Sequence, residues 1–297
     1  MNLAPITLFV YNRPWHTRQT IEALQKNDHA TESDLFIYAD GPKKAEHAGA
    51  VDEVRDFIRG VDGFKSVTII EREGNWGLAR SIISGVTEVV NRIGRIIVLE
   101  DDLLTSPFFL RYMNDALDLY DNEERVISIH AYAFPLNGAL PETFFLKGTG
   151  CWGWATWKRG WMIFEPDGHK LLEKINAGHL ENEFDLNGAY PYTQMLKDQI
   201  SGKNDSWAVR WYASGFLKDK LTLHYKKSFT CNIGLDGSGT HCHTDTITNY
   251  MPDHYRKIQK TEISPNEYVA KMMGNYFRSR KKSLMTRIKT GIANHFK

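Results

Sequence analysis

The sequence of 297 residues is poor in cysteine and has no long uninterrupted apolar run. Its three cysteines, Cys151, Cys231 and Cys242, are too few and too odd in number for the disulfide framework of a small secreted protein. The N-terminal residues lack the basic segment and apolar run of a secretory signal. No stretch approaches the roughly 18 apolar residues that a membrane span needs. We therefore expect a protein of the reducing cytoplasm that does not cross a bilayer.

Net charge is also nearly absent, at +1, but it is unevenly distributed. Residues 256–297 carry +9, which leaves residues 1–255 at −8. We expect an acidic domain over 1–255 and a basic helical tail over 256–297. An acidic body, and basic residues that do not interleave with aromatics, argue against nucleic-acid binding.

The tail has apolar residues at near-helical spacing among its cations. They are Phe277, Leu284, Met285, Ile288, Ile292 and Phe296. A basic amphipathic helix of this kind binds anionic membrane surfaces, so the sequence predicts a peripheral position on the inner face of the cell membrane. The alternative is a helix that docks on the protein's own body.

The first half of the chain alternates between apolar β-branched runs and helical apolar spacing. The predicted strands are 6–11, 34–39, 66–70, 96–99 and 126–130, and the predicted helices are 17–25, 51–61, 77–93 and a segment from Pro107 to about Tyr120. This pattern is typical of an α/β fold with a mostly parallel central sheet flanked by helices, which binds ligands at the carboxyl ends of its strands. Beyond residue 130 the alternation stops, and residues 205–244 are expected to mix short strands with a glycine-rich loop.

Three acids, Glu100, Asp101 and Asp102, follow directly after the apolar strand IIVL. Carboxylates gathered at the end of a buried strand repel one another and lose hydration, so the fold needs a reason to keep them. A Mg²⁺ or Mn²⁺ ion that also binds a diphosphate is such a reason. The alternative is a solvated acidic turn that caps the next helix.

Two further positions are candidates for nucleotide contacts. Asp40 follows another strand and can accept from a base or ribose group, although Asp before Gly is also a common turn former. Arg80 lies near the start of the long predicted helix, where it can contact phosphate, although such an arginine is more often merely solvated.

The segments ITLFVYNRP, NWGLARS, IIVLEDDLLTSPFF and GCWGWATW (150–157) together resemble the GT-A glycosyltransferases. The likeness is to the N-acetylglucosaminyltransferase I type and to bacterial sugar transferases with the same core. It covers about residues 4–245. It implies a GT-A (Rossmann-like) fold.

The resemblance also implies roles for residues at matching positions. Asp102 would bind the metal, while Glu100 and Asp101 face the nucleotide sugar. Asp40 would contact the uracil side of UDP, and Asn12 and Arg13 would approach the nucleotide. Trp152 or Trp154 would stack on a sugar, and His241 would lie in a loop, 234–241, that closes over the donor.

The catalytic base is where this sequence departs from the family. The acids of the family's Trp-Asp-Asp-Trp motif are replaced by Val209 and Arg210 between Trp207 and Trp211. Asp205 is then the nearest candidate base, and Asp236 is the fallback.

The sequence thus predicts a metal-dependent inverting glycosyltransferase. It would move sugar from a UDP-sugar to a glycan or lipid-linked acceptor in bacterial surface-polysaccharide synthesis. A sugar nucleotidylyltransferase is an alternative, but residues 12–15 lack the glycine-rich basic loop that such enzymes carry after strand one. A non-catalytic carbohydrate-binding protein is another alternative, because the position of the base is open.

Overall fold

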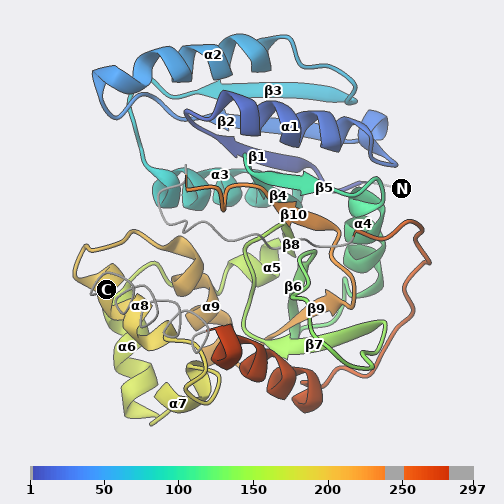
Figure 1. Cartoon of the computed structure of the whole chain (residues 1–297), viewed down its shortest axis with the longest axis vertical. Coiled ribbons are helices and arrows are strands. Elements are labelled where there is room, and N and C mark those ends of the chain that lie inside the picture. The colour runs from blue at the N-terminus through green and yellow to red at the C-terminus, as the bar shows by residue number, and fades with distance from the viewer. Residues whose placement is uncertain (1–2, 238–250, 281–297) are drawn as a thin grey trace, which may run out of the picture.

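The computed structural model describes residues 3–237 and 251–280. Its main sheet has eight strands in the order β3-β2-β1-β4-β8-β6-β9-β7 (Figure 1). In that order they are Ser66–Glu71, Asp34–Ala39, Ile6–Val10, Arg95–Glu100, Trp154–Trp157, Val126–His130, Leu221–Tyr225 and Thr143–Lys147. Strand β1 pairs in parallel with β2 and β4, β2 with β3, and β6 with β9. The expected α/β fold with a mostly parallel central sheet is confirmed.

The antiparallel pairs lie in the second half of the sheet. Strand β8 runs opposite to both of its neighbours, β4 and β6, and β7 runs opposite to β9. Strands β1, β2, β4 and β6 therefore all end at the same edge. A separate two-stranded ribbon pairs β5 (Leu103–Thr105) with β10 (Thr230–Asn232), so the segment after the three acids is held by a late part of the chain.

Helices cover both faces of the sheet. One core includes side chains of α1, α2 and α4, and a second includes those of α3, α5 and α9 with four tryptophans. Helices α6, α7, α8 and α9 enclose a smaller core at the lower left of Figure 1. The helices are α1 Pro14–Gln25, α2 Ala48–Arg59, α3 Leu78–Ile93, α4 Phe109–Leu119, α5 Lys158–Trp161, α6 Gly168–Ala177, α7 Glu181–Phe184, α8 Tyr192–Ile200 and α9 Trp207–Leu217, with 3-10 turns η1 Ala30–Glu32 and η2 Ala45–His47.

Helix α9 corrects the expectation of short strands over its residues. The segment WAVRWYASGFL is rich in residues that favour strands, but it is helical from Trp207 to Leu217. Ser206 caps the helix by accepting a hydrogen bond from the backbone N–H of Val209. Nearly every side chain of α9 is buried, so packing on several sides outweighs local preference.

The first part of the basic tail packs against the body. Ile258 and Val269 are buried, and Pro265 forms a β-bridge with Phe145 of β7. Residues 267–280 are helical and run beside β7 (Figure 1), where Phe277 contacts Phe134 and Tyr190. Residues 281–297 lie outside the described residues, so membrane association and a domain boundary at 255 stay predictions. Within the described ranges, no helix has the length and apolar character needed to span a membrane.

Candidate functional site

The three acids lie where β4 ends, beside the end of β1. Asp101 and Asp102 are 5% and 8% exposed, although neither belongs to the apolar core. Arg13 comes from the turn between β1 and α1, and its Nη2 donates both to Asp101 Oδ1 and to Asp102 Oδ2, the latter at 2.8 Å. Thr20 of α1 donates to the backbone carbonyl of Asp101 at 2.8 Å. Two neighbouring parallel strands thus bring one guanidinium between two buried carboxylates.

The electrostatics follow from this burial. Burial opposes the charge of Arg13, but Asp101 and Asp102 more than offset it and raise its pKa. Burial raises the pKa of Asp101, against the attraction of Arg13. Burial, with the charges of Asp102 and Asp101, raises the pKa of Glu100 to about 8. Protonation of Glu100 at neutral pH therefore relieves repulsion within the cluster.

Cys151 lies close to the same acids. Burial raises the pKa of its thiol, and the negative charges of Glu100 and Asp102 raise it further. The thiol is therefore protonated at neutral pH, so Cys151 lines the site beside the acids as an uncharged side chain and not as a nucleophile.

The segment after β10 covers the acids. The N–H of Ile233 donates to the carbonyl of Asp102 at 2.9 Å. A Cβ at Gly234 would overlap Asp102 Oδ2 and would lie 2.8 Å from Arg13 Nη1. Asp236, the fallback base, lies 3.1 Å from His16 Nε2 on α1. His241 and the rest of the predicted closing loop lie outside the described residues.

Asp40 is engaged by the protein itself. Its Oδ1 accepts from the N–H groups of Gly41 and Trp76, at 3.0 and 2.8 Å. Its Oδ2 accepts from the Asn75 side chain at 3.0 Å and from the N–H of Gly77 at 2.9 Å. Asp40 thereby fixes the turn that precedes α3, and its contact with uracil stays a prediction. Asn12 follows β1 beside Arg13, and its contact with the nucleotide likewise stays a prediction.

The two predicted sugar-stacking tryptophans differ in exposure. Trp154 is 1% exposed, and its ring stacks on that of Trp207 with centroids 5.5 Å apart. Trp152 is partly exposed, and its backbone N–H approaches Nε2 of the buried His130 at 3.3 Å. Burial lowers the pKa of His130, so its neutral ring can accept this hydrogen bond. Of the two tryptophans, therefore, only Trp152 has exposed surface on which a ligand could stack.

Arg80 and Asp205 lie in one groove of the surface. Both line a groove of about 550 Å³ between α3 and the start of α9. The Asp205 carboxylate is well exposed and lies 3.2 Å from Nη2 of Arg210. The structure thus brings the predicted base and a predicted phosphate contact into one groove.

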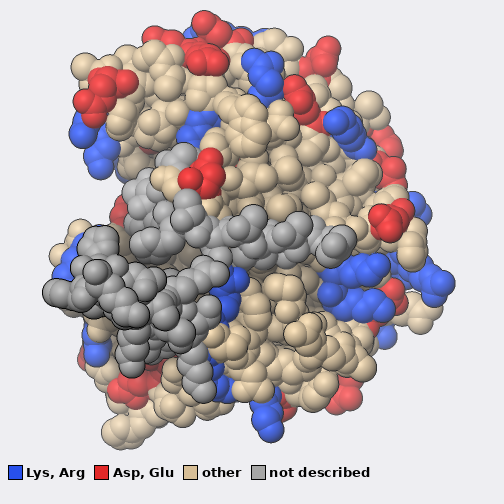
Figure 2. Space-filling model, in the orientation of Figure 1, with Lys and Arg blue, Asp and Glu red and all other residues tan. Residues whose placement is uncertain are grey.

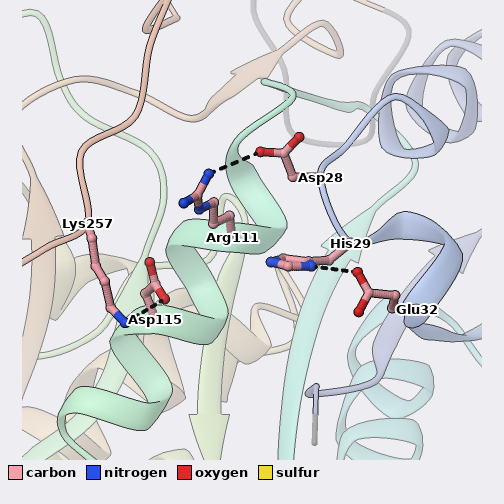
Figure 3. Close-up of a pocket in the computed structure, with 6 residues that line it drawn as sticks. All are labelled: Asp28, His29, Glu32, Arg111, Asp115 and Lys257. Carbon is pink, nitrogen blue, oxygen red and sulfur yellow. Dashed lines mark hydrogen bonds and ion pairs between the residues drawn. The ribbon is translucent and has the colours of Figure 1, made fainter. Parts of the chain in front are cut away.

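A second charged hollow lies at the amino edge of the sheet, where η1 leads into β2. It has a volume of about 480 Å³ and is lined by Asp28, His29, Glu32, Arg111, Asp115 and Lys257 (Figure 3). Each carboxylate faces a cation or a histidine, as in the Arg111–Asp28 pair at 3.6 Å. Figure 2 shows acidic and basic side chains intermingled over this right-hand edge of the molecule, so we assign these groups to solvated ion pairs.

Sequence reasoning missed two residues that organise the site. His16 lies one helical turn before Thr20, so both face the acids from α1, and this spacing was the available signal. Arg210 is the other: it lies in the first turn of α9 and pairs with Asp205, which immediately precedes the N-cap Ser206.

No family model and no curated protein sequence matches the chain. Among solved structures, the chain is similar to the mannosyltransferase PcManGT from Pyrobaculum calidifontis in complex with GDP-Man and Mn²⁺, with 13% identity over 44% of this chain and 36% of that one and a TM-score of 0.35. It is similar to S. aureus TarS 1-349 in complex with UDP-GlcNAc, with 12% identity over 76% and 57% and a TM-score of 0.40. It is also similar to a UDP-glucose pyrophosphorylase complexed with UDP-glucose, with 12% identity over 75% and 90% and a TM-score of 0.38. The chain thus spans less than two thirds of the first two proteins. Likeness at this level does not establish a family.

Proposed function

We propose that the chain is a glycosyltransferase that moves a sugar from a nucleotide-sugar donor to a hydroxyl of a glycan or lipid-linked acceptor. The observation that carries this proposal is the buried Asp101–Arg13–Asp102 arrangement at the carboxyl ends of β1 and β4. This edge of a parallel sheet is where α/β folds bind nucleotides. The donor is proposed to be a UDP-sugar and the setting bacterial surface-polysaccharide synthesis, as the sequence resemblance implies.

The carboxylates of Asp101 and Asp102 suit a hard divalent cation that takes only one or two ligands from the protein. Oδ2 of Asp102 accepts from Arg13, whereas Oδ1 has no hydrogen-bond partner within residues 3–237 and 251–280. The same residues contain no group of three side chains able to enclose a metal. Mg²⁺ is commonly held by one or two carboxylates together with substrate phosphates, so Asp102, with Asp101 beside it, fits such a site. When bound, Mg²⁺ or Mn²⁺ neutralises charge on the leaving diphosphate.

The chain's own residues supply the remaining steps. Arg13 orients the two carboxylates, and the 233–236 segment shields them from water. Asp205 takes the proton of the acceptor hydroxyl as that oxygen forms its bond to the sugar C1. The bond between C1 and the phosphate oxygen breaks at the same time, and its electron pair leaves with the nucleoside diphosphate. A single displacement of this kind inverts the configuration at C1.

Calorimetric titration with UDP-, GDP- and CMP-sugars, with and without Mn²⁺, tests the proposal. We expect one UDP-sugar to bind in a metal-dependent manner, with binding lost in Asp102→Ala and kept in Asp52→Ala, a substitution at an exposed acid of α2. Asp205→Asn should keep donor binding but lower kcat by about a hundredfold or more. Failure of every nucleotide sugar to bind under any metal condition would contradict the proposed function.

A further inference from the structure

The groove between α3 and α9 presents polar groups along an apolar floor. Arg80, Ser84, Thr87 and Glu88 line it from α3, and Asp205 and Arg210 line it from the start of α9. Ala79 and Ile83 supply apolar surface between them. A hollow with an apolar floor and a few converging polar groups is typical of a small-molecule site.

Arg80 is a prepositioned cation in this groove. Its guanidinium lies 4.0 Å from the centre of the Trp76 ring, on which Arg72 also stacks at 3.8 Å. Asp40 fixes the backbone of Trp76. Within residues 3–237 and 251–280, Arg80 forms no ion pair. Its charge is therefore held in place but not neutralised, and the nearby N-terminus of α3 adds to it.

The other charged groups of the groove form hydrogen bonds or ion pairs within the protein. Arg210 donates to the carbonyls of Ser206 and Pro166, each at 3.1 Å, and pairs with Asp205. Tyr38 donates to Glu88 at 3.0 Å. Arg80 and Glu88 are about 12 Å apart along α3, so the groove has a positive end and a negative end.

We propose that this groove binds the acceptor, and that the acceptor is a saccharide carrying an anionic group, a carboxylate or a phosphate, which Arg80 holds. The inference rests on the proposed function and names its acceptor class. The saccharide then lies in the same groove as Asp205, which receives the proton of the hydroxyl that attacks the donor. Arg80 thus selects the acceptor rather than binding the donor diphosphate.

The test uses the full chain labelled with 5-fluorotryptophan, with the Trp76 ¹⁹F resonance assigned by Trp76→Phe. The probes are methyl β-D-glucuronide, D-glucose 6-phosphate and the neutral methyl β-D-glucoside, each with and without UDP. We expect at least one anionic probe to shift the Trp76 resonance, to bind about tenfold more tightly than the glucoside, and to lose about tenfold in affinity in Arg80→Gln. Arg92→Gln, on the same helix and stacked on Phe36, should bind the probes as wild type does.

Several outcomes overturn the assignment. Equal binding of the neutral glucoside, unchanged binding in Arg80→Gln, or no binding of any probe would each contradict it. If UDP alone displaces the anionic probe, Arg80 contacts the donor diphosphate and not the acceptor. Asp102→Ala should keep probe binding, which separates the two proposals. If the probes bind but no nucleotide sugar does, the proposed transferase function is contradicted. If a nucleotide sugar binds but none of the probes does, acceptor binding in the groove is contradicted.

Discussion

Nη2 of Arg13, from the end of β1, lies 2.8 Å from Oδ2 of Asp102, at the end of β4. Because the same nitrogen also reaches Asp101, removal of the guanidinium leaves two buried carboxylates without a counter-charge. We expect Arg13→Gln to lower the free energy of unfolding by about 3–5 kcal/mol at neutral pH, as measured by urea denaturation. Arg18→Gln, a change on the helix that follows Arg13, should cost less than about 1 kcal/mol. A double variant with Asp101→Asn should recover part of the loss, and an additive loss would contradict the pairing.

Asp40→Asn separates a structural role from uracil recognition. The amide cannot accept all four hydrogen bonds that the carboxylate accepts, and one of its edges presents N–H groups to backbone N–H donors. The variant should lose about 2–3 kcal/mol of stability without any nucleotide present, and the fluorescence of Trp76 should change. Native stability with selective loss of UDP affinity would instead assign Asp40 to the nucleotide alone.

Gly234→Ala should displace the segment that covers the acids. The added methyl group would overlap Oδ2 of the buried Asp102 and would press against Nη1 of Arg13. We expect a loss of about 1–3 kcal/mol in thermal unfolding and weaker donor binding in calorimetry. Gly49→Ala in α2 is the matched control, because a Cβ there meets nothing within 4 Å and should be neutral or stabilising. Equal effects at both positions would count against close contact at Gly234.

The raised pKa of Glu100 predicts that the stability of the protein depends on pH. Its pKa is raised from 4.5 in the unfolded chain to about 8 in the fold, so the folded protein binds the extra proton between these values. Stability should therefore fall as pH rises from about 4.5 to about 8 and should level off above that. Glu100→Gln should remove this slope and be more stable than wild type at pH 9, by on the order of a few kcal/mol, in urea titrations across this range. Parallel pH profiles for the two proteins would refute the assignment.

The first half of the fold follows from local pattern. Strands 34–39 and 126–130 have the predicted bounds, because buried parallel strands read as continuous apolar runs. Helix α1 begins three residues earlier than expected, at Pro14, a residue suited to the first helical turn. The placement of the acids at the end of β4 follows from the same pattern.

The second half depends on contacts that no local pattern encodes. Trp154 is buried because Trp207, more than fifty positions later, covers its ring. Arg13 reaches Asp101 across 88 residues, and His16 reaches Asp236 across 220. The sequence could place each residue at the end of an element, but only the packing of the elements decides which of them meet.

The pairing of β5 with β10 sets an order of assembly. Strands β1 to β4 lie within the first hundred residues and can pair as soon as they leave the ribosome, whereas β5 has to wait for Thr230–Asn232. Bringing β5 and β10 together closes a long loop, and this costs conformational entropy before the contacts of the ribbon can stabilise it. The cover over Asp102 is therefore among the last parts of the molecule to form, and a nascent chain that lacks it exposes its charged strand ends to solvent.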